Sequence, residues 1–400
     1  MPLQKISKNS KKVLKKQCVT KKNIKNIREQ KFNQISNDQK NEFKYIHLPK
    51  ISIKQIETCY AIAINNSNTL CIVAMCSMIK IMEIQELKKE LNQNSLEDKA
   101  LCIQLQILEG IHTDIVSTLN FMEKPENIDS FISGSFDGRI IIWALKKIKE
   151  DFVKPKQWFP QFILLGHISY VNCLSLLNDE NIISGSSDNT IKLWNLNKLK
   201  NDWSCIQTVR EHTDIVLGLS INEEKKQLIS CGGDKKILIM KLTSNGKLQI
   251  NQIINVDIRG SRITFITNEL FVFLQESSNN LHIYKALRKN IYEKYQEFPV
   301  SGGGQSCDFY FPAQYIKQMN LLVLKNGRCV NLIKIVINLN NQNIEIQCNQ
   351  QQVLTFGKLE ISRTYGTLSN NGDLLVTWNS TSNQIQFRIL KENIEINHHI

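Results

Sequence analysis

Three residues near the middle of the chain, Ser184, His167 and Asp188, are of the types that form a catalytic triad. In such a triad a serine hydroxyl attacks the substrate, a histidine removes its proton and a carboxylate orients the histidine. The same types recur twice, as His112, Ser133 and Asp137 and as His212, Ser230 and Asp234. One enzyme rarely needs three copies of one active site. We therefore expect a structural role, which labelling of Ser184 by a serine-reactive probe would contradict.

The elements that must position these residues are short strands. Four are predicted between residues 163 and 196, over Ile163–Leu165, Val171–Leu177, Asn181–Ser184 and Thr190–Trp194. Asp188 and Asn189 suit a tight turn, because both tolerate left-handed backbone angles. Apolar residues alternate along these strands, which predicts a small sheet with a packed face. One such sheet cannot bury that face alone, so the unit must repeat.

The unit does repeat in a common register. Asp188 stands six residues before Trp194 and four after Ser184. The repeat before this one ends on Trp143, and the repeat after it ends on Met240. The clearest repeats are 103–145, 163–196 and 206–242. Weaker copies are 60–84 ending on Met82, 263–286 ending on Tyr284, 321–335 ending near Leu332, and 374–390 ending on Phe387 with Thr377 and Thr381 in the Ser and Asp positions. Seven repeats are predicted in all.

Gly166-His167, the Ser-Gly-Ser-x-Asp turn at 184–188 and Trp194-Asn195 resemble a repeat of the WD-repeat (G-protein beta-like) family. The resemblance implies an all-β fold, a single seven-bladed β-propeller over 45–396, with six or eight blades as alternatives. It implies that Tyr45–Ile53 supplies a strand that closes the ring. It also implies structural tetrads, in which the Trp indole bonds the Ser, the Ser bonds the His and the His bonds the Asp. Their members would be His112, Ser133, Asp137, Trp143, His167, Ser184, Asp188, Trp194, His212, Ser230 and Asp234.

Charge is concentrated in residues 1–44. The chain carries a net +13, but this segment holds twelve Lys and one Arg against three acidic residues, a net of +10. Its composition predicts a disordered basic tail. Alternatives are a nuclear-localisation cluster, an electrostatic clamp on nucleic acid or an anionic membrane, or lysine enrichment through compositional bias. The remaining residues carry only +3.

Eleven scattered cysteines, without a C-x-x-C pair, predict buried reduced thiols rather than disulfides or a metal site. No apolar run reaches the ~20 residues of a transmembrane helix, and the N-terminus lacks a signal segment. We therefore expect a soluble protein of the cytoplasm, with the nucleus as an alternative, and no cofactor. The Gly-rich stretch Ser301–Ser306 lacks a phosphate-binding context. His398 and His399 alone make a poor metal site.

Two insertions are predicted in the blade loops. Residues 85–99 read as a short surface helix whose Leu87 and Leu91 share one face. Residues 146–160 end in Trp158-Phe159-Pro160, where the two aromatic residues either pack within the sheet edge or form an exposed anchor for a partner. Packing is the expectation in both cases.

Partner-facing positions follow from the family resemblance. They would be Ile115, Tyr170 and Ile215, then Ser117, Asn172 and Leu217, then Phe136, Ser187 and Gly233. Among these, Phe136, Tyr170 and Leu217 are the best candidate anchors; the alternative is that they only line the mouth of the propeller. The predicted function is a non-enzymatic protein-interaction scaffold in a larger complex, without a small-molecule substrate. The alternative is a nucleic-acid-associated propeller in RNA processing or ribosome assembly that uses the basic tail.

Overall fold

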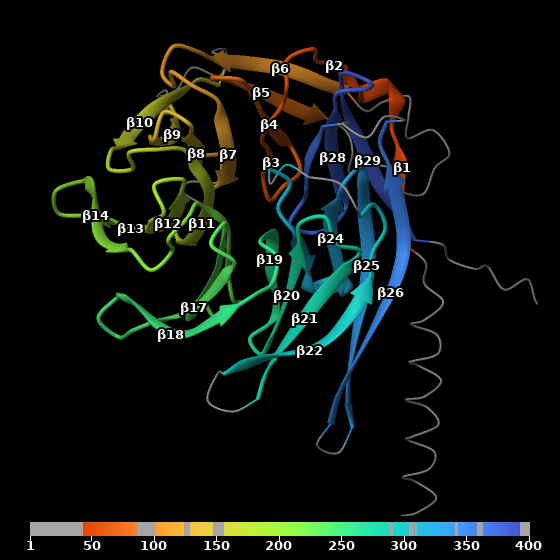
Figure 1. Cartoon of the computed structure of the whole chain (residues 1–400). Coiled ribbons are helices and arrows are strands. Elements are labelled where there is room, and N and C mark those ends of the chain that lie inside the picture. Colours follow the sequence, from red (N-terminus) through yellow and green to blue (C-terminus); the bar gives the residue numbers. More distant parts are fainter. Residues whose placement is uncertain are drawn as a thin grey trace, which may run out of the picture. The chain divides into compact units, whose positions relative to one another are not determined.

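The computed structural model describes residues 43–85, 101–123, 129–146, 156–287, 291–303, 308, 310–340, 343–357 and 363–392. Residues 1–42 of the predicted tail, residues 86–99 of the predicted helix, His398 and His399 lie outside the described residues. Phe43 and Lys44 belong to strand β1, and Gln85 ends strand β5. The described residues form seven antiparallel sheets, six of four strands and one of five (Figure 1). This confirms the predicted all-β class and the seven blades.

The first four blades follow the chain in order. Blade one holds β3 (Ile62–Ile64), β4 (Leu70–Met75), β5 (Met78–Gln85) and β6 (Leu101–Leu108). Blade two holds β7 (Val116–Phe121), β8 (Phe131–Ser135), β9 (Ile140–Leu145) and β10 (Trp158–Leu164). Blade three holds β11 (Val171–Asn178), β12 (Asn181–Ser186), β13 (Ile191–Asn197) and β14 (Asp202–Val209). Blade four holds β15 (Val216–Ile221), β16 (Gln227–Gly232), β17 (Lys236–Leu242) and β18 (Leu248–Asn255).

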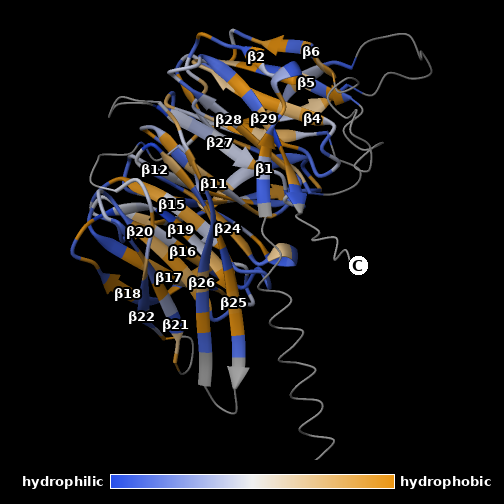
Figure 2. Cartoon of the chain, turned by 90° about the vertical axis from the view of Figure 1, so that its right-hand side faces the viewer, coloured by the Kyte–Doolittle hydropathy of each residue, from blue (hydrophilic) through white to orange (hydrophobic). Residues whose placement is uncertain are grey.

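The remaining blades keep this order. Blade five holds β19 (Gly260–Thr267), β20 (Leu270–Gln275), β21 (Asn280–Ala286) and β22 (Tyr292–Pro299). Blade six holds β23 (Gln314–Ile316), β24 (Leu321–Asn326), β25 (Cys329–Asn340) and β26 (Asn343–Thr355). The short 3-10 helix η4 (Lys317–Met319) lies between β23 and β24. In blade six, β25 and β26 form a long hairpin along which apolar and polar residues alternate (Figure 2).

Blade seven joins segments from distant parts of the sequence. Its sheet order is β1 (Phe43–His47), β29 (Gln384–Glu392), β28 (Leu374–Asn379) and β27 (Thr364–Leu368). After η1 (Pro49–Ile51), β2 (Ile53–Lys54) also pairs with β29. The N–H of Leu48 donates to the carbonyl of Phe387 at 2.8 Å. The predicted closing strand at 45–53 is therefore confirmed.

The repeat and the blade are offset from one another. The predicted first strand of the repeat, Ile163–Leu165, belongs to β10, and Ile163 pairs with Ile141 of blade two rather than with a strand of blade three. Each loop that carries a tetrad histidine therefore leaves the outer strand of one blade and enters the inner strand of the next. One sequence repeat spans the gap between two blades.

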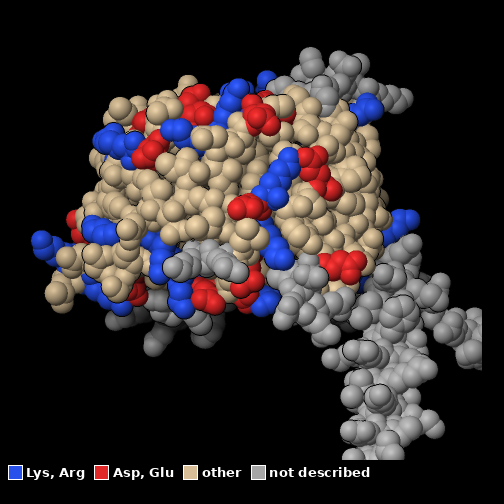
Figure 3. Space-filling view, turned by 60° about the horizontal axis from the view of Figure 1, so that its bottom comes forward, with Lys and Arg blue, Asp and Glu red and all other residues tan. Residues whose placement is uncertain are grey.

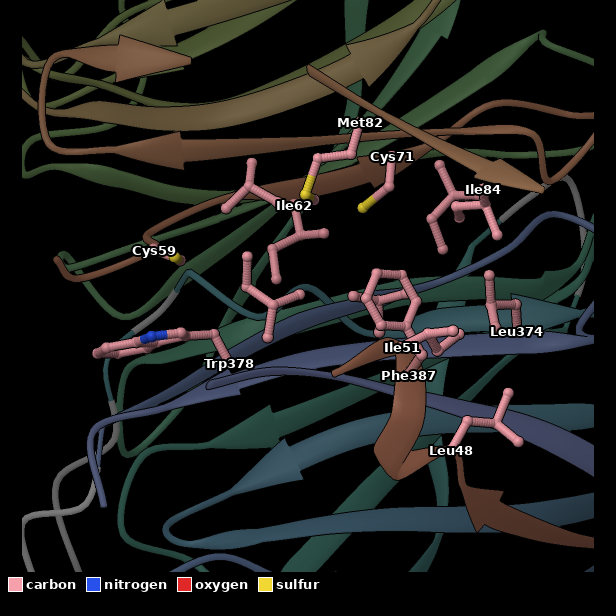
Figure 4. Packing of buried hydrophobic residues seen from close by; sticks show 14 of the residues in the cluster. Leu48, Ile51, Cys59, Ile62, Cys71, Met82, Ile84, Leu374, Trp378 and Phe387 are labelled. Carbon is pink, nitrogen blue, oxygen red and sulfur yellow. The ribbon is translucent and has the colours of Figure 1, made fainter. Parts of the chain in front are cut away.

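Packing between adjacent sheets forms the core. Seven clusters of buried apolar side chains lie between successive blades, including one between blades seven and one. Figure 4 shows that last cluster, where Met82 and Cys71 of blade one pack against Phe387 and Leu374 of blade seven. Each blade therefore buries apolar side chains on both of its faces, because each face packs against a neighbouring blade.

Two of the predicted repeat-ending residues are wrong by one position. In blades one, three, four and five, the strand register shifts immediately before the repeat-ending residue, as between Leu193 and Trp194. In blade six the shift precedes Ile333, not Leu332. In blade seven Arg388, which pairs with Leu375, takes the place of Phe387. The turns explain both errors, because the turn between the second and third strands is one residue shorter in blade six and one longer in blade seven.

Candidate functional site

Blade three contains a continuous chain of hydrogen bonds. The indole Nε1 of Trp194 donates to Oγ of Ser184 at 2.9 Å, and that hydroxyl donates to Nε2 of His167 at 2.7 Å. His167 Nδ1 donates to Oδ2 of Asp188 at 2.8 Å. Because an ionised carboxylate only accepts, Nδ1 carries the hydrogen and Nε2 is the acceptor. Every polar group of this buried set has a partner.

Blade two repeats the same chain with nearly the same distances. Trp143 Nε1 donates to Ser133 Oγ at 2.8 Å, Ser133 contacts His112 Nε2 at 2.8 Å, and His112 Nδ1 lies 2.9 Å from Asp137 Oδ2. The main-chain N–H of Thr113 also donates to Asp137 at 3.0 Å. The carboxylate thus fixes the loop that carries the histidine to the turn that carries the aspartate.

Blade four has three of the four members. His212 Nε2 lies 2.9 Å from Ser230 Oγ, and His212 Nδ1 lies 3.0 Å from Asp234 Oδ1. Met240 replaces the tryptophan and is fully buried, but its thioether has no hydrogen to donate. The Ser230 hydroxyl therefore has one hydrogen bond fewer than Ser184.

Burial and hydrogen bonding shift the pKa values of Asp137, Asp188 and His212 in these tetrads. Burial alone would raise the pKa of the Asp137 carboxyl, but the hydrogen bonds from His112 and Thr113 outweigh it and lower that pKa to about 2. The pKa of Asp188 is lowered in the same way against the effect of its burial, by His167 and Thr190. Burial lowers the pKa of His212, although Asp234 opposes the shift. Asp137 and Asp188 are therefore ionised and His212 is neutral at pH 7.

The geometry favours architecture over catalysis. Ser133, Ser184 and Ser230 each have 0% of their surface exposed. A nucleophilic hydroxyl must reach a substrate, whereas these are sealed between two blades. Among the described residues, no group of three His, Cys, Asp or Glu side chains is arranged to hold a metal ion.

Blades five and seven replace the tetrad. In blade five the positions of His, Ser, Asp and Trp are taken by Val256, Phe273, Ser277 and Tyr284, and Tyr284 stacks on Phe271 with centroids 4.7 Å apart. In blade seven the guanidinium of Arg388 donates from Nη1 to Oγ1 of Thr377 at 2.7 Å, as the indole does elsewhere. Arg388 also lies over the ring of Phe356, at 5.1 Å, and burial lowers its pKa to about 10.

A second repeating feature escaped the sequence analysis. A glutamine in the outer strand of five blades reaches the main chain of the next blade's outer strand. These residues are Gln106, Gln207, Gln252, Gln296 and Gln352. In Gln252, Nε2 donates to the carbonyl of Tyr292 at 2.8 Å and Oε1 accepts from its N–H at 2.8 Å. In blade two, Phe162 occupies this position instead. The recurrence of Gln in the last strand of five blades was the available signal.

In three blades the residue whose main chain bonds this glutamine is a Trp or a Tyr, and its side-chain N–H or O–H makes a further hydrogen bond. Trp158 Nε1 donates to the carbonyl of Asp129 at 2.7 Å, Tyr292 Oη to that of Asn268 at 2.7 Å, and Tyr45 Oη to that of Gly372 at 2.5 Å. Trp158 is only 3% exposed, so it packs within the blade as predicted, while Phe159 is 41% exposed.

The candidate partner-facing residues lie together at one end of the central channel. The N–H groups of Phe136, Ser187 and Gly233 donate to the carbonyls of the residues that precede β7, β11 and β15, each at 2.8 Å. These acceptors are Ile115, Tyr170 and Ile215. The turns of blades two to four are thus held in one geometry. All these residues are at least partly exposed.

The second residue of each of the strands β7, β11 and β15 forms part of the channel wall. Ser117 is 3%, Asn172 6% and Leu217 6% exposed, and all three line a cavity of about 210 Å³. Asn172 Nδ2 donates to Ser187 Oγ and to the carbonyl of Val216 in the next blade, both at 2.9 Å. Leu217 is therefore part of the channel wall rather than a surface anchor.

Aromatic residues gather at the same end of the channel. Phe136 and Tyr170 stack face to face with centroids 4.1 Å apart, and Tyr310 lies 6.0 Å from Phe136. Tyr170 is 45% exposed, and the same loop carries the more exposed Leu165 and Ile168, at 70% and 92%. The last two were missed by sequence reasoning, because single apolar residues in a loop carry no periodic signal.

Comparison with known proteins fits this geometry. Residues 158–195 and 203–239 match the family model described as WD domain, G-beta repeat. Together with the seven sheets, these matches define the chain as a WD-repeat β-propeller. No helix in the described part of the chain is long and apolar enough to cross a membrane.

Three curated relatives each match about a third of the chain. It is 31% identical over 121 residues to p21-activated protein kinase-interacting protein 1-like of Xenopus laevis, with 30% of each chain covered. It is 26% identical over 133 residues to Ribosome biogenesis protein WDR12 homolog of Trichoplax adhaerens, covering 32% of this chain and 27% of the relative. It is 32% identical over 122 residues to Coatomer subunit beta'-1 of Arabidopsis thaliana, covering 30% and 11%. Less than a third of each relative is matched.

Proposed function

We propose that this protein is a non-enzymatic scaffold that binds a partner protein through the loops at the Phe136–Tyr170 end of its channel. The observation that carries the proposal is the stacked Phe136–Tyr170 pair, with Ile168 and Leu165 exposed on the adjoining loop. Exposed aromatic and aliphatic side chains on a rigid support are typical of binding hot spots. Rigid blades with variable loops suit that role.

The test is co-purification from the native cells, followed by mass spectrometry. The double variant Ile168→Ser/Tyr170→Ala removes a 92% exposed side chain and the ring that stacks on Phe136, and it should lose partners that the unmodified protein retains. Leu199→Ser is the matched control, because Leu199 is 99% exposed in a distant turn of blade three. The same partners in both variants would overturn the proposal.

The basic tail supports a second candidate, association with nucleic acid. Residues 1–44 carry a net +10, and one relative is named as a ribosome biogenesis protein. In contrast, basic and acidic residues are interspersed over the propeller face in Figure 3, with broad uncharged areas between them. This candidate predicts that RNA co-purifies at low salt and dissociates as salt rises, and that deletion of residues 1–42, which leaves β1 intact, abolishes the binding. RNA binding that survives the deletion would contradict a role of the tail.

A further inference from the structure

A positive charge is buried at the boundary between blades six and seven. Arg388, on β29, is only 8% exposed, and burial lowers its pKa to about 10, so it remains charged at pH 7. Its hydrogen bonds go to two neutral oxygens, Oγ1 of Thr377 at 2.7 Å and Oε1 of Gln386 at 2.6 Å. No carboxylate pairs with it in the described part of the chain. A buried charge is unfavourable unless an opposite charge compensates for it.

The position that Arg388 occupies does not require a charge. In blades two and three the neutral indoles of Trp143 and Trp194 donate the hydrogen bond that Arg388 donates in blade seven. Met240 fills the same position in blade four without any donor. A neutral side chain is therefore sufficient there, and the guanidinium supplies N–H groups beyond the one that Thr377 accepts.

One of these additional donors is open to solvent. Nε of Arg388 makes no hydrogen bond to any described residue. The sealed polar atoms that lack a partner include Nε of Arg262 and Nδ1 of His282, but Nε of Arg388 is not among them. Water therefore reaches this N–H although the residue as a whole is buried, and a small ligand atom can reach it as well.

The surroundings of Arg388 favour an anion. Residues 310–392, which form blades six and most of seven, contain eight Lys and Arg and four Asp and Glu, a net of +4. The chain after residue 44 carries only +3 in total. The ring of Phe356 covers one face of the guanidinium, with its centroid 5.1 Å from Cζ. Carboxylate and phosphate oxygens bind a guanidinium in its plane, at the edge that carries the N–H groups.

We propose that Arg388 binds an oxyanion, a phosphate or a carboxylate, at the boundary between blades six and seven. An anion oxygen accepts the hydrogen of Nε, and the negative charge compensates the buried guanidinium. The site belongs to other blades than the Phe136–Tyr170 surface, so either proposal can fail without the other.

The experiment follows the Nε–H signal of Arg388 by NMR in the full-length protein, labelled with ¹⁵N in its arginines, during titration with sodium phosphate or sodium acetate. Arg388→Lys removes this signal and thereby assigns it. We expect a saturable shift, and sodium chloride at equal ionic strength should cause none. Tighter binding of phosphate assigns the site to a phosphate group, and tighter binding of acetate assigns it to an acidic side chain. No saturable shift with either anion would overturn the proposal.

A second variant supplies the negative charge from within the protein. Because Oε1 of Gln386 already accepts from Nη2 of Arg388, Gln386→Glu should form an ion pair of nearly the same size and weaken phosphate binding about tenfold. Thermal unfolding shows whether this variant is folded, and its midpoint should not fall below that of the unmodified protein. Arg363→Gln is the control, because it removes an exposed guanidinium from the residue before β27 and should leave phosphate binding unchanged. If Gln386→Glu binds phosphate as tightly as the control, Arg388 is not the anion site.

Discussion

Blades three and five solve the same packing problem with opposite chemistry. Blade three places four polar side chains between sheets and connects them all by hydrogen bonds. Blade five places Phe271, Phe273 and Tyr284 in the equivalent layer, where Phe271 stacks on Tyr284, and Nδ1 of its His282 has no hydrogen-bond partner in the described part of the chain. The comparison indicates that an unbroken hydrogen-bonded chain is one way to join two blades and aromatic stacking another. Only a complete polar chain makes each of its members indispensable.

The largest expected effect is that of Trp194→Ala. It removes a buried aromatic side chain, a loss of roughly 3 to 5 kcal/mol, and deprives Ser184 of its donor at a further ~1 to 3 kcal/mol. Urea denaturation should show a strongly reduced midpoint. Phe159→Ala, at a 41% exposed position, is the control and should shift it little. An unchanged midpoint for Trp194→Ala would refute the structural role of the tetrad.

A finer comparison uses the serines of blades three and four. Ser184→Ala removes the hydrogen-bond partner of both Trp194 Nε1 and His167 Nε2, whereas Ser230→Ala removes that of His212 Nε2 alone. We expect losses of about 2 to 3 and about 1 to 2 kcal/mol respectively. Equilibrium unfolding of the two variants measures the difference. Equal losses would mean that the indole hydrogen bond adds nothing.

Acid should weaken the tetrads in a defined pH range. The pKa of Asp137 is about 2 in the folded protein and ~3.9 when unfolded, so its stabilisation, about 2 kcal/mol, is complete above about pH 4 and is lost as the pH falls toward 2. The lowered pKa of His212 adds a loss that begins as the pH falls below ~6.5. Denaturation midpoints across this range give the profile. Asp137→Asn should flatten its acidic part; an unchanged slope would exclude Asp137 as the cause.

The smallest expected effect concerns the outer strands. Gln252→Leu removes both hydrogen bonds to the main chain of Tyr292 and should cost about 1 kcal/mol. Gln161→Leu, at an exposed position of β10, is the matched control. Thermal unfolding of both variants tests whether the glutamine joins blades four and five. A Gln252→Leu protein as stable as the control would show that it does not.

The structure could be predicted from the sequence most accurately at the buried polar residues. Ser, His and Asp recur at fixed spacing in blades two to four because each hydrogen bond tolerates little change in distance. The apolar repeats had no such constraint, and a change of one residue in a turn displaced the expected position from Ile333 to Leu332 and from Arg388 to Phe387. The outer-strand glutamines resembled ordinary polar alternation.

The closing blade sets an order for assembly. Its sheet needs β1 and β2, which precede the other described strands in the sequence, and β27 to β29, which follow them and are therefore translated later. Until those final strands are synthesised, β1 has no sheet to join and blade one exposes the face that later packs against blade seven. The ring can therefore close only after the ribosome has translated β29, which ends at Glu392. A chain truncated shortly before β29 would present two unprotected blade faces to any chaperone that binds apolar surface.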